Sequence, residues 1–179
     1  MATSKQEAQW VLRAQCHDRE ALELLLRSAQ PFLRRYLCSV VGKTSADDVL
    51  QDVLVLVCRK LTWLHTPELF RPWAYRIASR TAFRHLKKER VWSEQVREEA
   101  VLHATPAPET RPPDEVLNNL LQSDVLSAAS RAVLALHFQE ELPLSDVAAI
   151  LQIPLGTVKS RLAYGLAALR KQFVLKRSF

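Results

Sequence analysis

The chain has 179 residues, of which 48% are hydrophobic, and it carries a net charge of +6. No apolar run approaches the roughly 18 to 20 residues that a membrane-spanning helix needs, and the N-terminus lacks the order of a secretory signal, so we expect a cytoplasmic protein. Only three glycines occur, and the balance of residues favours helix over sheet, which predicts an all-α fold.

The positive charge is concentrated in one short segment. Residues 71–90 carry seven basic side chains and one acidic side chain, whereas the rest of the chain is balanced. A patch this dense attracts a polyanion, and nucleic acid is its natural partner. A solvated helix face is the alternative interpretation.

A proline-rich segment divides the chain. The stretch from His103 to Glu115 reads HATPAPETRPPDE and holds four of the nine prolines, so no helix can pass through it. We expect an extended, acidic linker over residues 96–114. It would join an N-terminal module, residues 1–95, to a C-terminal module, residues 115–179, each a small helical domain.

In the N-terminal module, apolar residues at helical spacing continue from Trp10 to Leu37, and Gly42 breaks the pattern. Ser45 is positioned to cap the next helix, which buries a side rich in valine and leucine and turns three polar side chains outward. These three are Asp48, Gln51 and Asp52. We favour a protein-docking face over a metal site here. Asp48 and Asp52 share one helix face, but the sequence indicates no histidine or further carboxylate elsewhere that would join them as a metal ligand.

A helix from about Pro72 to about Arg90 follows, since proline fits the first turn of a helix. Basic side chains recur on it every three or four residues, where like charges repel by about 0.2–0.5 kcal/mol per pair, so we expect a compensating partner outside the fold. The basic residues are Arg76, Arg80, Arg84, Lys87 and Lys88, and the packed side holds Trp73, Ile77, Ala78 and Leu86.

The C-terminal module is predicted to hold two helices, about Glu115–Gln122 and Ser127–Gln139, followed by a helix-turn-helix. Its first helix spans Leu142–Leu151, and residues 153–156 form the turn before the second. In such a motif the second helix enters the DNA major groove. Its outward side chains are Thr157, Lys159, Ser160, Arg161, Ala163 and Tyr164. A helical hairpin that binds protein is the alternative.

The reactive residues form no catalytic or metal-binding pattern. Cys16, Cys38 and Cys58 lack paired spacing, and we expect all three to be buried. The five histidines are scattered, and no glycine-rich phosphate loop occurs. We therefore predict no catalytic residues, no metal, no cofactor and no enzymatic activity.

Three stretches resemble the extracytoplasmic-function (ECF) sigma factors, a subfamily of the sigma-70 family of bacterial RNA polymerase sigma factors. The stretch LSDVAAILQIPLGTVKSRLAYGLAALRK resembles the promoter-reading helix-turn-helix of sigma region 4. In sigma region 2, SADDVLQDVLVLVCRKL resembles the helix that docks on the polymerase β′ clamp, and FRPWAYRIASRTAFRHLKKER resembles the helix that opens the promoter. The resemblance covers nearly the whole chain and implies a factor that binds core RNA polymerase and directs promoter-specific transcription initiation.

The resemblance also implies a role for each candidate residue. Asp48, Gln51 and Asp52 would bind the β′ clamp. The minus-ten promoter element would meet Trp73, Arg76, Arg80, Arg84, Lys87 and Lys88. The minus-thirty-five element would be read by Lys159, Ser160, Ala163 and Tyr164, with Thr157 and Arg161 on phosphates. Further implied partners are the β flap of the polymerase, promoter DNA as a whole and an anti-sigma factor.

The chain departs from the family pattern at several positions. Arg80 and Arg84 stand where the family often carries Asn and Asp. Tyr164 and Leu166 stand where it often carries basic residues late in the reading helix, and Pro143 replaces a usual Ser cap and offers no capping oxygen. Two alternatives stay open. One is a one-component helix-turn-helix transcription regulator, which predicts a ligand pocket and a dimer. The other is a sigma-like adaptor that binds polymerase without opening promoters.

Overall fold

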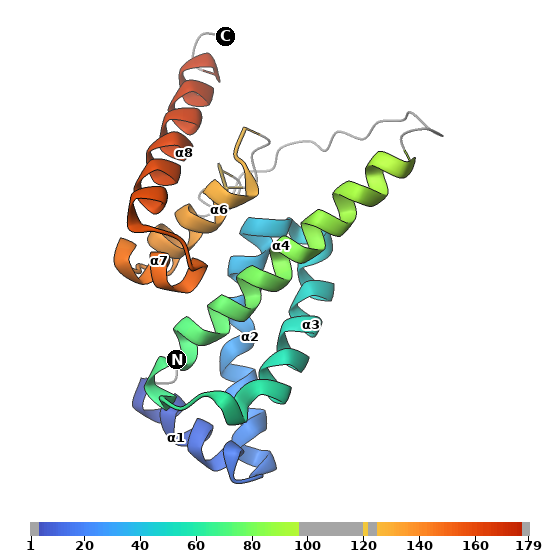
Figure 1. Cartoon of the computed structure of the whole chain (residues 1–179), viewed down its shortest axis with the longest axis vertical. Coiled ribbons are helices and arrows are strands. Elements are labelled where there is room, and N and C mark those ends of the chain that lie inside the picture. Colours follow the sequence, from blue (N-terminus) through green and yellow to red (C-terminus); the bar gives the residue numbers. More distant parts are fainter. Residues whose placement is uncertain (1–3, 97–119, 122–124, 177–179) are drawn as a thin grey trace.

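The computed structural model describes residues 4–96, 120–121 and 125–176, and every regular element in these ranges is helical (Figure 1). The all-α prediction is therefore confirmed. The predicted linker, residues 96–114, and the helix expected near Glu115–Gln122 fall almost entirely outside the described residues and stay predictions.

The N-terminal helices surround the long helix α2. They are α1 (Ser4–Gln15), α2 (Arg19–Val41), α3 (Lys43–Lys60) and α4 (Phe70–Val96), with the short 3-10 helices η1 (Leu61–Trp63) and η2 (Pro67–Leu69) between α3 and α4. Helix α2 packs against α1, α3 and α4, and α3 also packs against α4. Helix α4 continues past its predicted end at Arg90.

Gly42 separates α2 from α3. Its φ of 87° lies in the left-handed region that glycine adopts without a steric penalty, and α3 begins at the next residue, Lys43. The prediction that Ser45 caps α3 is therefore wrong. Ser45 lies inside the helix, and its hydroxyl donates to the carboxylate of Glu89 on α4 at 3.1 Å.

The C-terminal helices are α6 (Ala128–Leu134), the π-helix η3 (Ala135–Gln139), α7 (Leu144–Leu151) and α8 (Leu155–Lys176). Ser127 caps α6, because its hydroxyl oxygen accepts the backbone N–H of Ser130 at 3.1 Å. Helix α8 begins at Leu155, inside the turn predicted for residues 153–156, so the turn of the helix-turn-helix is shorter than expected.

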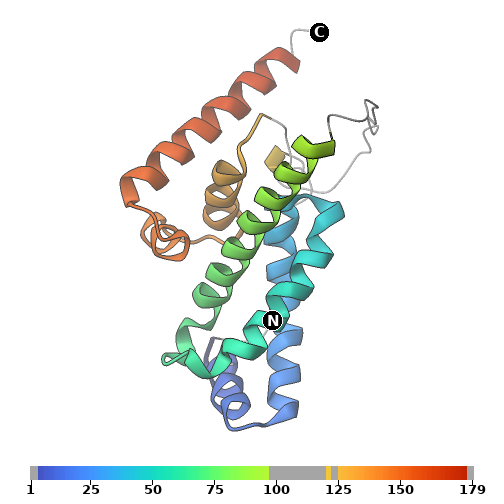
Figure 2. The ribbon, with the colours of Figure 1, turned by 45° about the vertical axis from the view of Figure 1, so that its right-hand side comes forward.

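The two modules are docked on each other, a contact that the sequence did not predict. Helix α2 packs against α6 and η3, and α4 packs against α7. Helix α4 accordingly lies between α3 and the C-terminal helices, while the far end of α8 points away from the N-terminal helices (Figures 1 and 2). The buried hydrophobic residues of both modules form one cluster, which includes Tyr36 and Ala78 on one side and Leu136 and Val147 on the other.

The cysteines are not all buried. Cys38 of α2 is buried, as predicted, but Cys16 and Cys58 are exposed. Cys16 lies in the turn after α1, and Cys58 lies on the outer side of α3, next to the buried Val57. The prediction of three buried cysteines is therefore wrong for these two.

Candidate nucleic-acid interface

Helix α3 presents three polar side chains to solvent. Val49 and Val53 are buried against the neighbouring helices, with relative exposures of 1% and 0%. Residues three or four positions apart share a helix face, so Asp48, Gln51 and Asp52 point away from that packed side, and all three are exposed. We call these three residues the acidic face.

The neighbouring Asp47 adds little negative charge to the acidic face. Its carboxylate accepts two hydrogen bonds from the Arg34 guanidinium of α2, at 2.7 and 3.1 Å. The hydrogen bond from Arg34 lowers the pKa of Asp47. Because Arg34 neutralises Asp47, the net charge of this part of α3 comes from Asp48 and Asp52.

Helix α4 presents most of the predicted cations to solvent. Small residues, Ala74, Ala78 and Ala82, are fully buried on its packed side and let α4 approach its neighbours closely. The exposed cations are Arg80, Arg84, Lys87 and Lys88, while Arg76 and Trp73 are half-buried. We call these six residues the basic face. Trp73 packs against Phe70, with ring centroids 6.2 Å apart, so only part of the indole is open to a ligand.

The helix-turn-helix comprises α7 and α8. Pro143 stands at the N-cap of α7 without a side-chain hydrogen bond, as its chemistry requires. Gln152 ends α7 in the left-handed conformation, with φ 55° and ψ 47°, and its backbone N–H donates to Ala148 O. Val158, buried on the inner side of α8, fixes the rotation of that helix about its axis.

That rotation directs the predicted reading residues outward. Lys159, Ser160, Ala163 and Tyr164 are exposed, and Thr157 and Arg161 are half-buried. Tyr164 is the most open of the exposed large hydrophobic residues among those described, at 76%. Ser160 donates its hydroxyl to Thr157 O at 3.0 Å, which leaves the hydroxyl oxygen available as an acceptor.

The basic face and the helix-turn-helix meet. The Arg76 guanidinium donates to the backbone carbonyl of Ala149 in α7 at 3.2 Å, and the Arg80 guanidinium donates to the side-chain oxygen of Gln152. The sequence predicted that a partner outside the fold would compensate the repulsion between these cations. Part of that compensation comes from the chain itself, through the end of α7.

A buried carboxylate that sequence reasoning missed joins the modules. Glu140 follows η3, and its side chain is only 6% exposed. Arg35 of α2 donates to both of its oxygens, Nε to Oε1 at 2.9 Å and Nη2 to Oε2 at 2.8 Å. The Tyr75 hydroxyl of α4 donates to Oε2 as well. Nearby, Ser39 donates to the side-chain oxygen of Gln139 at 2.9 Å.

The environment of Glu140 affects Tyr75. Tyr75 is 2% exposed, and burial raises the pKa of its hydroxyl, with the negative charge of Glu140 adding to the effect. Tyr75 therefore stays protonated and donates its proton to the carboxylate. No local sequence pattern could have revealed the pairing of Arg35 with Glu140, since these two residues are 105 positions apart in the sequence.

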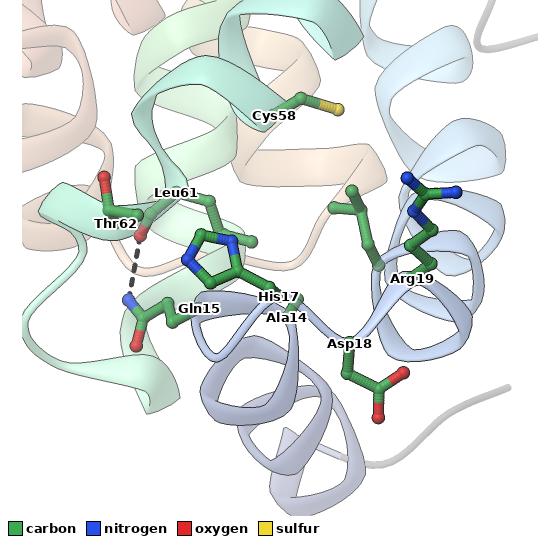
Figure 3. A pocket seen from close by; sticks show the side chains of 9 residues that line it. Ala14, Gln15, His17, Asp18, Arg19, Cys58, Leu61 and Thr62 are labelled. Carbon is green, nitrogen blue, oxygen red and sulfur yellow. Dashed lines mark hydrogen bonds between the residues drawn. The ribbon is translucent and has the colours of Figure 1, made fainter.

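A pocket of about 380 Å³ lies elsewhere, between the α1–α2 turn and the end of α3 (Figure 3). His17, Arg19 and Cys58 are among the residues that line it. Gln15 closes one side, since its side-chain amide donates to the backbone carbonyl of Leu61 at 2.8 Å. The pocket shares no residue with the acidic face, the basic face or the helix-turn-helix.

The described part of the chain holds no evident metal site, since no three of its His, Cys, Asp or Glu side chains gather in a way that could hold a metal ion. Among the helices that the structure describes, none has the length and apolar character needed to cross a bilayer.

The sequence matches two family models. The Sigma-70 region 2 model matches residues 25–91, which include the acidic face and the basic face. The Sigma-70 region 4 model matches residues 124–171, which include the helix-turn-helix. Both models therefore cover the surfaces described above.

Individual proteins match over most of the chain. The RNA polymerase sigma-H factor of Pseudomonas aeruginosa is 31% identical over 176 residues, covering 90% of this chain and 91% of that protein. The ECF RNA polymerase sigma factor SigW of Bacillus subtilis is 30% identical, covering 71% and 74%. The sigma factor RpoE of Bartonella quintana, solved in complex with the anti-sigma factor NepR, superposes with a TM-score of 0.63 at 23% identity, covering 86% and 94%.

Proposed function

The chain belongs to the ECF RNA polymerase sigma factors, and from this premise we propose which of its surfaces carry out the function of a sigma factor. As a member of that family it is a transcription initiation factor that associates with RNA polymerase and binds promoter DNA, and it is not an enzyme. The observation that supports the assignment of surfaces is the order along the chain of an exposed acidic face, an exposed basic face and a helix-turn-helix.

The acidic face is the proposed docking site for core polymerase. Asp48, Gln51 and Asp52 are exposed side by side on one rigid helix, so they can pair with a basic surface of the β′ clamp without rearrangement. The second proposed polymerase contact is between the C-terminal module and the β flap. The modules would be residues 1–95 and 115–179, with residues 96–114 as the linker.

The basic face is the proposed contact for the minus-ten element. Arginine and lysine side chains bind the phosphates of the opened strand, and the half-buried Trp73 offers an aromatic ring on which a base can stack. Cations spaced three and four residues apart on one helix face can bind successive phosphates of a strand without reading its sequence. Any base preference therefore has to come from the few side chains that contact bases.

The outward side of α8 is the proposed reader of the minus-thirty-five element. Lys159 and Ser160 can approach base edges from the first turns of the helix, where a recognition helix meets the major groove. Ala163 and Tyr164 extend the base-facing surface, and Thr157 and Arg161 would hold phosphates. Such a division would fix the position of α8 through phosphates and its specificity through bases.

We further propose regulation by an anti-sigma factor and a cytoplasmic location. The solved relative from Bartonella quintana was crystallised with an anti-sigma factor, which supports a partner of this kind for the present chain. A protein that acts on bacterial polymerase and chromosomal DNA has its partners in the cytoplasm.

The alternative within the same family is an adaptor that binds polymerase without opening promoters. Arg80 and Arg84 favour it, because they replace the polar residues that the family often carries in the melting helix. The one-component regulator predicted a ligand pocket, and the pocket beside Cys58 is the candidate for it. The family match over both regions favours the sigma factor.

Co-purification with core RNA polymerase, followed by transcription from a genomic DNA library, tests the proposal. We expect the tagged chain to retain core polymerase and the reconstituted complex to produce discrete transcripts. Binding without transcripts would support the adaptor, and absence of binding would contradict the docking role of the acidic face.

A further inference from the structure

We propose that the pocket between the α1–α2 turn and the end of α3 is a binding site for a small organic anion, a carboxylate with a short apolar body. The pocket shares no residue with the surfaces assigned to polymerase and to promoter DNA, so the inference does not depend on those assignments. It rests on an apolar inner wall, an arginine that has no partner among the described residues, and a histidine at a helix end where glycine is usual.

The inner wall of the pocket is apolar and belongs to the hydrophobic core. Leu61 is buried, and Ala14 and Leu22 are half-buried and pack against the core. The volume of about 380 Å³ is at the small end of the range of ligand pockets, roughly 300–1,000 Å³. The pocket can therefore take the apolar part of a small molecule, and removal of that part from water would contribute to the affinity.

Arg19 supplies a positive charge to the pocket. Among the residues that the structure describes, none forms an ion pair or a side-chain hydrogen bond with its guanidinium. The acidic side chain that lines the pocket, Asp18, is already engaged. Its Oδ1 accepts the backbone N–H of Ala21, and its Oδ2 accepts a hydrogen bond from Arg13 at 2.8 Å. The charge of Arg19 is therefore not neutralised, and a carboxylate can pair with its guanidinium through two hydrogen bonds.

His17 follows α1 in a backbone conformation that glycine usually adopts. Its φ of 66° lies in the left-handed region. Its backbone N–H donates to Ala14 O at 3.0 Å, and the N–H of Asp18 donates to Arg13 O at 3.1 Å. This pair of hydrogen bonds is a Schellman motif, in which glycine is the usual residue at the left-handed position. Since glycine would adopt this conformation more easily, the backbone alone does not explain the histidine.

The side chain of His17 lines the pocket together with those of Gln15, Arg19 and Cys58 (Figure 3). An N–H of its imidazole can donate to an anion that pairs with Arg19. Gln15 fixes the wall beside it, because its amide donates to the backbone carbonyls of Leu61 and Leu64 at 2.8 and 2.9 Å. The pocket therefore exists before a ligand binds, which reduces the cost of ordering the site.

Protection of Cys58 from alkylation is the test, with Cys16 as a control on the same molecule. Both cysteines are exposed, but of the two only Cys58 lines the pocket. The reagent is iodoacetamide, which is uncharged: the thiolate sulfur displaces iodide and forms a thioether, and peptide mass spectrometry measures its extent at each cysteine of the full chain. The probes are benzoate and hexanoate. Their amides are matched uncharged controls, and inorganic phosphate is an anion without an apolar body.

We expect at least one of the two carboxylates to slow the alkylation of Cys58 in a saturable way and to leave that of Cys16 unchanged. At a carboxylate concentration about ten times the dissociation constant, the rate at Cys58 should fall about tenfold, because only molecules with an empty pocket react. The amides and phosphate should protect Cys58 much less, since each lacks one of the two parts that the pocket recognises.

Two variants test the roles of Arg19 and His17. Arg19→Gln should weaken the protection about tenfold through loss of a charged hydrogen bond, whereas Arg27→Gln makes the same change of charge two turns further along α2 and should leave it intact. His17→Gly should raise the thermal unfolding midpoint, because glycine fits the left-handed position, and should still weaken the protection. A histidine with a purely structural role would not show these opposite effects.

The proposal is wrong if neither carboxylate protects Cys58 at concentrations up to about 10 mM, where even a site with a millimolar dissociation constant is mostly occupied. It is also wrong if Cys16 is slowed to the same extent, if the amides or phosphate protect as well as the carboxylates, or if Arg19→Gln and Arg27→Gln act alike. None of these measurements involves polymerase or DNA, so their outcome is independent of the proposed function.

Discussion

Among single residues, Glu7 shows how a buried charge attaches α1 to the rest of the fold. Its side chain is 3% exposed, and Arg71 of α4 donates to both of its oxygens, at 2.8 and 2.9 Å. The Arg71 guanidinium also lies over the ring of Phe32, 5.0 Å from its centroid. One arginine therefore connects α1, α2 and α4, and the two partners of the ion pair differ in their access to water.

That difference predicts unequal effects of removing either partner. Arg71→Ala leaves a buried carboxylate unpaired and should lower the free energy of unfolding by about 3 kcal/mol. This value is at the low end for breaking a buried ion pair, because the Arg71 side chain is itself 38% exposed. Glu7→Gln leaves an arginine that can reach water and should lower it by about 1 kcal/mol. Urea denaturation followed by circular dichroism measures both.

The matched control is Arg27→Ala. Arg27 pairs with Glu23 at 2.7 Å on the surface of α2, and both side chains are more than half exposed. Exposed pairs of this kind contribute little, so the variant should unfold like the wild type. Equal losses for Arg71→Ala and Arg27→Ala would show that burial of Glu7 has no energetic consequence.

Asp18 makes the stability of α2 depend on pH. Its Oδ1 accepts the backbone N–H of Ala21, and its Oδ2 accepts a hydrogen bond from Arg13; the bond from Ala21 foremost lowers the pKa of Asp18. A carboxyl with a lowered folded-state pKa stabilises the fold above its unfolded pKa, about 3.9, and loses that contribution as the pH falls through the folded value.

Asp18→Asn keeps a capping oxygen but cannot titrate. We therefore expect the variant to lose less stability than the wild type between about pH 5 and about pH 2. Thermal unfolding midpoints over that range provide the measurement. Superimposable pH profiles would mean that Asp18 is not among the groups responsible for acid unfolding.

Among the helices, the crossing of α6 and α8 depends on Gly165. A Cβ at this position would lie 2.9 Å from Leu134 Cδ1 and 3.4 Å from Ser130 Cβ, and Leu134 is only 1% exposed, so it has little room to move. We expect Gly165→Val to lower the free energy of unfolding by about 1–3 kcal/mol through overpacking. Urea denaturation provides the measurement.

Gly156→Val is the control in the same helix. A Cβ at Gly156 would meet nothing within 4 Å, so we expect stability within about 0.5 kcal/mol of the wild type. Similar losses at Gly156 and Gly165 would point to the valine itself, and not to the α6–α8 contact, as the cause.

The helices were predictable from the sequence because each has a buried stripe at its own spacing. Val49, Val53 and Val57 are buried as their periodicity indicated. The ends were less predictable. A serine at position 45 suggested a cap, but Gly42 alone ends the preceding helix, and Ser45 binds Glu89 of a helix far along the chain.

In the whole molecule, the acidic face and the basic face were predictable, but the contact between the modules was not. Exposure of Asp48 and Arg84 follows from the position of each on its helix. The pairing of Arg35 with Glu140 depends on three-dimensional docking, and each residue alone looks like an ordinary surface charge in the sequence. The hydrogen bond between Arg80 and Gln152 also depends on this docking, so no sequence pattern indicated it.

The acidic face gives a prediction for the assembled complex. Reversal of Asp48 and Asp52 to Lys should abolish co-purification with core polymerase and leave the helical content unchanged, because both side chains are exposed. Reversal of Glu20 and Glu23 to Lys on α2 makes the same change of charge elsewhere and should leave co-purification intact. Retained binding in the Asp48 and Asp52 variant would remove the docking assignment.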